Sequence, residues 1–204
     1  MKDVFFGPED VKLHGVLMPS DRSGAPGIVI CHPHPQYGGS MNNNVVLGVE
    51  AVMNEAGYTT LRFNFRGVGR SGGVSGDGEP ERKDVERAVD FLAADASVGS
   101  IHLVGYSFGA MVGLRACIED ERVESMTGIA PPTVMDSFDF LRNNKKPLLA
   151  IAGSQDDFCN VPALEPVVQA CGGKIELIPG ADHFLLNEEH RAGEFAREFI
   201  ASLL

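Results

Sequence analysis

Short apolar runs alternate with amphipathic stretches along most of the chain. Six runs have the length and composition of buried strands, at residues 28–31, 60–65, 101–104, 126–129, 148–152 and 175–178. Two earlier runs, 4–6 and 13–17, predict a strand pair joined through a turn-rich tetrapeptide. The clearest helical period is 81–94, with Pro80 at its first turn, and the last is 188–203.

This alternation predicts an α/β protein with a mostly parallel sheet, helices on both faces and an antiparallel strand pair leading in. At 204 residues the chain is expected to form a single domain, residues 1–204. In open sheets of this class, ligands bind outside the carboxyl ends of the strands. The chemistry is therefore expected in the loops that follow strands.

Composition and charge narrow the class of partner. The formal net charge of −11 argues against nucleic acid and anionic membranes, because both are polyanions that attract basic surfaces. No apolar run approaches the length of a membrane span, and the N-terminus meets Asp3 and Gly7 too early for a signal peptide, so a cytoplasmic protein is expected. The four cysteines lack Cys-x-x-Cys spacing, which favours reduced packing cysteines over a metal site.

One loop after a strand carries a candidate nucleophile. Residues 101–104 lead into Gly105-Tyr106-Ser107-Phe108-Gly109, and a stretch rich in small and apolar residues follows as a predicted helix. This strand, turn and helix order is what a nucleophile elbow needs, since the flanking glycines allow a sharp turn that raises the serine hydroxyl above the sheet. The helix N-terminus there favours a developing negative charge.

Two other glycine-rich motifs are also present, but the residues that follow them do not fit the structures that these motifs require. A second Gly-x-Ser-x-Gly places Ser71 at its centre, but residues 74–78 are too rich in glycine to open a helix. Residues 67–72 also match Gly-x-Gly-x-x-Gly, yet a dinucleotide site requires the third glycine inside the opening helix. The predicted helix begins only near Pro80, so this stretch is interpreted as a loop and no cofactor is expected.

The serine needs an imidazole base and an orienting acid. His183 lies in the loop after the last predicted strand and is the preferred base, with His32 and His34 as competitors. After the strand at 148–152, Asp156 has the Gly-x-x-Asp spacing expected of the acid, and Asp157 is held as the alternative. The chain order Ser, Asp, His is that of α/β-hydrolases and differs from the other serine-triad folds.

Catalysis also needs N–H donors for an oxyanion. One is expected from the backbone of Phe108, directly after the nucleophile. The second is expected from the loop after residues 28–31, where Pro33 and Pro35 have no N–H and His34 is the best-placed donor. A simple rigid turn is the alternative interpretation of that loop.

Several motifs together resemble one family. His32-Pro33-His34-Pro35 is the first, and the others are residues 38–43, 61–71, 105–109, 130–132 and 180–184. With these motifs, which span nearly the whole length, the chain resembles the small capless serine esterases of the α/β-hydrolase superfamily, in the dienelactone-hydrolase group. The resemblance implies a Ser-Asp-His triad, no cofactor and hydrolysis of esters.

Where a lid is usually inserted, residues 130–146 have room for one short helix at 136–142 and no domain. An open site is expected, for which the sequence offers Tyr37, Phe138, Phe158 and Phe184 as pocket residues, with Phe108 and Leu185 also considered.

The predicted function is hydrolysis of a small-molecule carboxylic ester or thioester through an acyl-serine intermediate. Three alternatives stay open: a hydrolase of peptide, lactone or C–C bonds, a non-catalytic binding protein, and a dinucleotide-dependent oxidoreductase.

Overall fold

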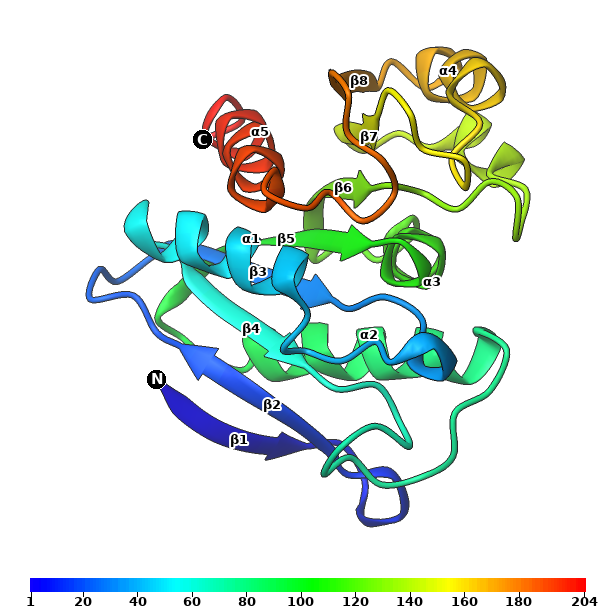
Figure 1. The fold of residues 1–204 in the computed structure, drawn as a ribbon. Coiled ribbons are helices and arrows are strands. Elements are labelled where there is room, and N and C mark those ends of the chain that lie inside the picture. Colours follow the sequence, from blue (N-terminus) through cyan, green and yellow to red (C-terminus); the bar gives the residue numbers. More distant parts are fainter.

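The computed structural model describes residues 1–204, and all eight of its strands join one sheet (Figure 1). The strands are β1 (Lys2–Phe6), β2 (Leu13–Met18), β3 (Ala25–Cys31), β4 (Thr59–Phe63), β5 (Val98–Tyr106), β6 (Val123–Ile129), β7 (Leu148–Gly153) and β8 (Lys174–Ile178). Their order in the sheet is β1-β2-β4-β3-β5-β6-β7-β8. The β1–β2 and β2–β4 pairs are antiparallel, and every other pair is parallel. The predicted mostly parallel sheet with an antiparallel lead is confirmed.

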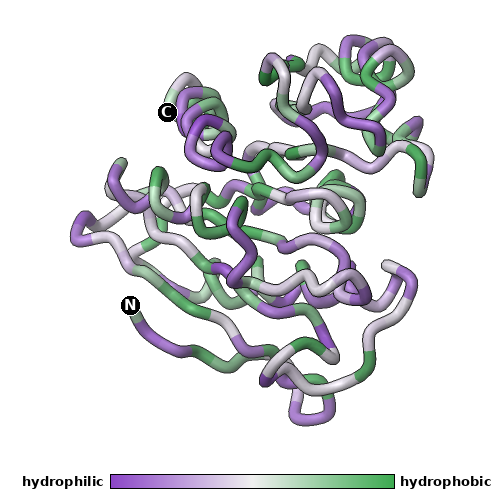
Figure 2. Tube along the Cα trace, viewed as in Figure 1, coloured by the Kyte–Doolittle hydropathy of each residue, from purple (hydrophilic) through white to green (hydrophobic).

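Five α-helices cover the sheet: α1 (Asn44–Glu55), α2 (Glu79–Ala93), α3 (Phe108–Cys117), α4 (Val161–Ala170) and α5 (Glu189–Ala201). Helices α1 and α5 pack together on one face, while α2, α3 and α4 lie on the other. The core is accordingly divided into two buried clusters, of 31 and 20 residues, with the sheet between them. Hydrophobic colour runs through the middle strands, while the outer turns are mainly hydrophilic (Figure 2).

The sheet differs from the sequence expectation at its last strand. Residues 175–178 were expected to be buried, but β8 pairs only with β7 and forms an edge of the sheet. Leu177 is therefore 43% exposed, and within β8 only Ile178 is buried. A run of apolar residues is compatible with an edge strand when one of its faces is left uncovered.

The connection between β6 and β7 contains no lid. A loop leads from Ala130 to a 3₁₀ helix at Asp139–Asn143, which is shorter and later than the predicted helix at 136–142. The carboxyl ends of the central parallel strands are consequently left open. None of the helices combines the length and apolar character needed to cross a bilayer.

Candidate active site

A tight turn between β5 and α3 presents Ser107. Its backbone has φ 53° and ψ −118°, a conformation that few residues other than glycine adopt. The flanking glycines are required by space: a Cβ on Gly105 would lie 2.4 Å from the Gly109 carbonyl oxygen, and a Cβ on Gly109 would lie 2.3 Å from the Cys31 carbonyl oxygen. The Gly-x-Ser-x-Gly pattern is thus the condition for α3 to begin directly above β3 and β5.

Three side chains from three different loops form one hydrogen-bonded line. Ser107 Oγ lies 2.9 Å from His183 Nε2, and His183 Nδ1 lies 3.0 Å from both carboxylate oxygens of Asp156. Ser107 follows β5, Asp156 follows β7 and His183 follows β8, so the parallel sheet brings residues distant in sequence to one edge. All three residues are at least 91% buried, which strengthens their electrostatic interaction.

The structure distinguishes between the two adjacent acids. Asp156 Oδ1 also accepts the backbone N–H groups of Phe158 and Cys159, at 2.8 and 3.0 Å, which fix the carboxylate toward His183. Asp157 is exposed and has no hydrogen bond to His183. Burial raises the pKa of the neighbouring Cys159 thiol to about 12, and the Asp156 charge adds to the effect. That thiol therefore stays protonated at neutral pH and is no nucleophile.

Two backbone N–H groups lie close to the serine, one at the first position of α3 and one in the loop after β3. Phe108 is the first residue of α3, so its N–H has no intrahelical acceptor. The His34 N–H makes no hydrogen bond within the chain, while its carbonyl accepts the N–H groups of Tyr37 and Gly39. The His34 ring packs 4.6 Å from the Phe108 ring, so the two loops are in direct contact. The structure thus places both residues beside the turn that carries Ser107, and their role as oxyanion donors stays a prediction.

A cavity of about 400 Å³ opens at Ser107, and we call it the Ser107 cavity. It is lined by Pro33, His34, Tyr37, Gly38, Gly39, Asn43, Tyr106, Ser107, Met135, Phe158, His183 and Phe184. Three of the four predicted pocket aromatics are among them.

Phe138 was wrongly expected in this cavity. It is only 4% exposed and belongs to the core on the α4 side of the sheet, because the 3₁₀ helix that follows it packs against α4. Phe108 and Leu185, also considered for the pocket, are buried and are not among the lining residues. Sequence reasoning missed Met135 and Asn43 as lining residues; nothing marked Met135, and Asn43 was noted only within the family motif at 38–43. In the structure Asn43 also caps α1.

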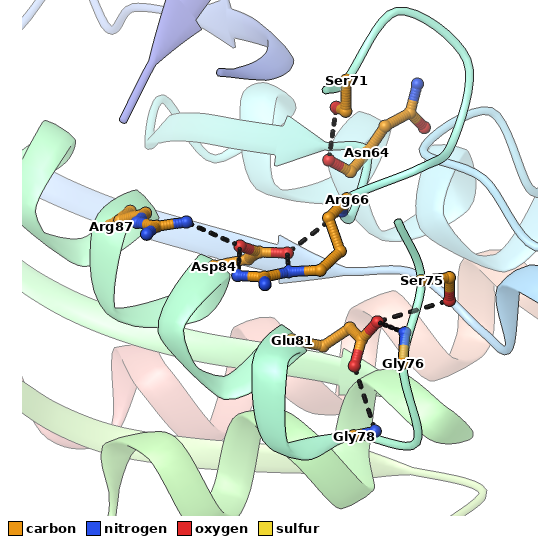
Figure 3. A network of polar contacts seen from close by, with 9 residues as sticks. All are labelled: Asn64, Arg66, Ser71, Ser75, Gly76, Gly78, Glu81, Asp84 and Arg87. Carbon is orange, nitrogen blue, oxygen red and sulfur yellow. Dashed lines mark hydrogen bonds and ion pairs between the residues drawn. The ribbon is translucent and has the colours of Figure 1, made fainter. Parts of the chain in front are cut away.

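Ser71 has a structural role. Its Oγ donates to the Asn64 carbonyl at 2.7 Å (Figure 3). The same Oγ accepts the His14 N–H at 2.9 Å, which holds the glycine-rich loop against β2. The Glu81 carboxylate accepts the N–H groups of Gly76 and Gly78. Within the Gly-x-Gly-x-x-Gly stretch itself, the N–H groups of Gly67, Ser71 and Gly72 donate to backbone carbonyls of the chain, and α2 begins only at Glu79.

The competing histidines are engaged elsewhere. His32 is fully buried and its Nε2 accepts the Phe65 N–H at 3.0 Å. His34, the other competitor, accepts the Gln36 N–H on its Nδ1 at 3.2 Å. His102, which was not a competitor, lies between the hydroxyls of Ser100 and Ser125. Nowhere do three His, Cys, Asp or Glu side chains come together in a way that could hold a metal ion.

Comparison with known proteins identifies the fold family. Residues 28–144 match the family described as alpha/beta hydrolase fold. The structure of a serine hydrolase homologue from Coxiella burnetii is 29% identical, with a TM-score of 0.86 over 100% of this chain and 97% of its own. A serine hydrolase without lid from Xanthomonas campestris is 26% identical, with a TM-score of 0.87 over 100% of this chain and 94% of its own.

A curated relative has a named activity. The human mitochondrial palmitoyl-protein thioesterase ABHD10 is 34% identical over 109 residues, which make up 52% of this chain and 33% of the human protein. The matched stretch is thus about half of one protein and a third of the other.

Proposed function

The chain belongs to the alpha/beta hydrolase fold family, and from this premise we propose that it is a serine hydrolase of carboxylic esters or thioesters with small to medium acyl groups. The observation that carries the proposal is the unbroken line from Ser107 through His183 to Asp156 at the mouth of the Ser107 cavity. The lidless fold is shared with the Xanthomonas campestris serine hydrolase. Membership of the dienelactone-hydrolase group is part of the proposal.

In the first half of the reaction, Ser107 Oγ attacks the carbonyl carbon of the substrate while His183 Nε2 takes the hydroxyl proton. The negative charge that develops on the carbonyl oxygen is bound by the N–H groups of Phe108 and His34. The bond to the leaving oxygen or sulfur then breaks, and His183 returns the proton to the departing alcohol or thiol. Asp156 holds the imidazole in the tautomer with its proton on Nδ1 and stabilises the imidazolium.

In the second half, water replaces the leaving group. His183 takes a proton from the water, whose oxygen attacks the acyl carbon and displaces Ser107, so that a carboxylic acid is released and the serine regains its proton. Water is the only co-reactant that these steps require.

The volume of the Ser107 cavity supports the proposed size of the acyl group. A volume of about 400 Å³ is at the lower end of ligand pockets, which suits a small to medium acyl group. Met135, Phe158 and Phe184 give the cavity an apolar side for that group. The thioesterase relative supports thioesters as one substrate class.

The decisive experiment is covalent labelling with a fluorophosphonate, read by intact mass. We expect one adduct on the wild type and on Ser71→Ala, and none on Ser107→Ala, while all three proteins stay folded by circular dichroism. Ester and thioester panels then give the acyl preference, with turnover in Ser107→Ala lower by at least about 10⁴-fold. A folded wild type that takes no label and cleaves no ester would favour a non-catalytic binding protein instead.

A further inference from the structure

One buried histidine contacts the loop that carries the second oxyanion donor. His32 Nδ1 lies 2.6 Å from the Pro33 carbonyl oxygen, and its Nε2 accepts the Phe65 N–H at 3.0 Å. Because an amide can only donate, Nε2 must be unprotonated and the ring proton must reside on Nδ1. The contact to Pro33 is therefore an Nδ1–H donating to a carbonyl. Burial lowers the pKa of His32 to about 4, so the ring is neutral at pH 7.

The carbonyl that His32 binds belongs to the same peptide unit as the proposed oxyanion donor. The Pro33 carbonyl and the His34 N–H are the two ends of one planar peptide, so a bond that fixes the oxygen also fixes the direction of the N–H. Gly39 also packs closely against that oxygen, because a Cβ at this position would lie only 2.1 Å from it. The Pro33 carbonyl is thus in contact with both the His32 ring and the Gly39 backbone.

We propose that His32 is a positioning residue that aims and polarises the Pro33–His34 peptide toward the substrate oxyanion. The hydrogen bonds run in one direction: Phe65 N–H to His32 Nε2, His32 Nδ1–H to Pro33 oxygen, and His34 N–H to the oxyanion. Bonds in such a chain polarise one another, so each strengthens the next. The inference rests on the proposed function, since it assigns an oxyanion role to the His34 N–H.

The arrangement explains the spacing of His32-Pro33-His34-Pro35. The first histidine supplies the anchor, Pro33 supplies a carbonyl without a competing N–H, and His34 supplies the free donor. A buried Nδ1–H needs an acceptor in any role, and here that acceptor is the carbonyl of the same peptide that carries the His34 N–H.

Two matched variants distinguish the effect of the hydrogen bond to Pro33 from the effect of packing by the His32 ring. His32→Asn places an amide nitrogen near the position of Nδ1 and keeps a donor for Pro33, while it loses the acceptor for Phe65. His32→Gln places an amide oxygen near the position of Nε2 and keeps that acceptor, while it loses the donor for Pro33. Each variant thus removes one of the two hydrogen bonds and leaves a smaller side chain.

We expect His32→Gln to lower kcat by about 10- to 100-fold, with KM of a p-nitrophenyl ester nearly unchanged, because the loss is confined to the transition state. His32→Asn should recover most of that kcat although it is no more stable in urea unfolding. Equal losses in both variants, or losses that follow stability, would overturn the proposal.

A measurement on the unmodified protein covers the case in which neither variant folds. The His32 Nδ1–H proton is followed by NMR before and after a trifluoromethyl ketone forms a hemiketal with Ser107. We expect a downfield shift of this proton on adduct formation, with the ring protons of His102 as an unmoved internal reference. No shift on a formed adduct would overturn the proposal, whereas failure to form any adduct or to cleave any ester would instead refute the proposed function.

Discussion

At the scale of single residues, the choice of acid shows what position in space adds to position in sequence. Asp156 and Asp157 are adjacent and chemically identical, and only spacing from the strand favoured the first. In the structure Asp156 is buried against His183 and receives two backbone N–H groups, while Asp157 is exposed. The difference is expected to appear in kinetics.

We expect Asp156→Asn to lower kcat by about 10⁴-fold, because an amide neither holds the required tautomer nor stabilises the imidazolium. Asp157→Asn should leave kcat close to that of the wild type. Steady-state ester hydrolysis by both variants, with far-UV circular dichroism as the control for folding, tests this. Similar losses in the two variants would show that the acid is not Asp156.

The residues predicted well were those fixed by order along the chain. A serine, an acid and a histidine placed after successive parallel strands must meet at one edge, so Ser107, Asp156 and His183 could be assigned to one site without coordinates. Phe138 was misplaced because an aromatic residue in a loop can face a cavity or the core with the same sequence signal. Met135 was missed for the same reason: which side of a loop faces the serine is set by packing.

At the scale of elements, helix α2 contributes buried carboxylates as well as an apolar face. The period at 81–94 predicted the helix within two residues, but it gave no role to the acidic residues of the helix. Glu81 and Asp84 are in fact fully buried, where Asp84 pairs with Arg66 and Arg87, and Glu81 binds the loop before the helix (Figure 3). Helical period cannot reveal this role, since the partner loop is placed by the fold.

We expect Glu81→Gln to lower the free energy of unfolding by about 1–3 kcal/mol, because a neutral amide leaves one of two buried N–H groups poorly bonded. The exposed Glu86 on the same helix provides the matched control, and Glu86→Gln should lie within about 0.5 kcal/mol of the wild type. Urea unfolding followed by fluorescence or circular dichroism measures both. A loss no greater than that of the control would show that the loop is held without Glu81.

At the scale of the whole molecule, two buried imidazoles link stability to pH. His32 and His102 are both fully buried, and burial lowers the pKa of each to about 4 from an ordinary value near 6.5. Above pH 6.5 both are neutral whether the chain is folded or unfolded, so neither affects stability. Between pH 6.5 and 4 the unfolded chain binds protons that the folded chain does not, which favours unfolding.

Stability is therefore expected to fall as the pH is lowered from 6.5 to 4, by about 3 kcal/mol for each histidine across the full interval. Urea unfolding at pH 7.5, 6.0 and 5.0 measures the slope. His102→Gln, which has no titrating group at this position, should show a smaller slope than the wild type. Equal slopes would mean that His102 titrates alike in both states.

The strained turn at Ser107 has a consequence for which residues selection retains at this position. A left-handed φ at a residue with a side chain is a stored cost of about 1–3 kcal/mol, and glycine would relieve most of it. Ser107→Gly should therefore unfold at higher urea concentration than Ser107→Ala, which keeps the strain, although both have lost the nucleophile. Selection for stability alone would replace this serine with glycine. A serine retained at this strained turn is therefore what the proposed hydrolase activity predicts, since only a need for its hydroxyl would offset the lost stability.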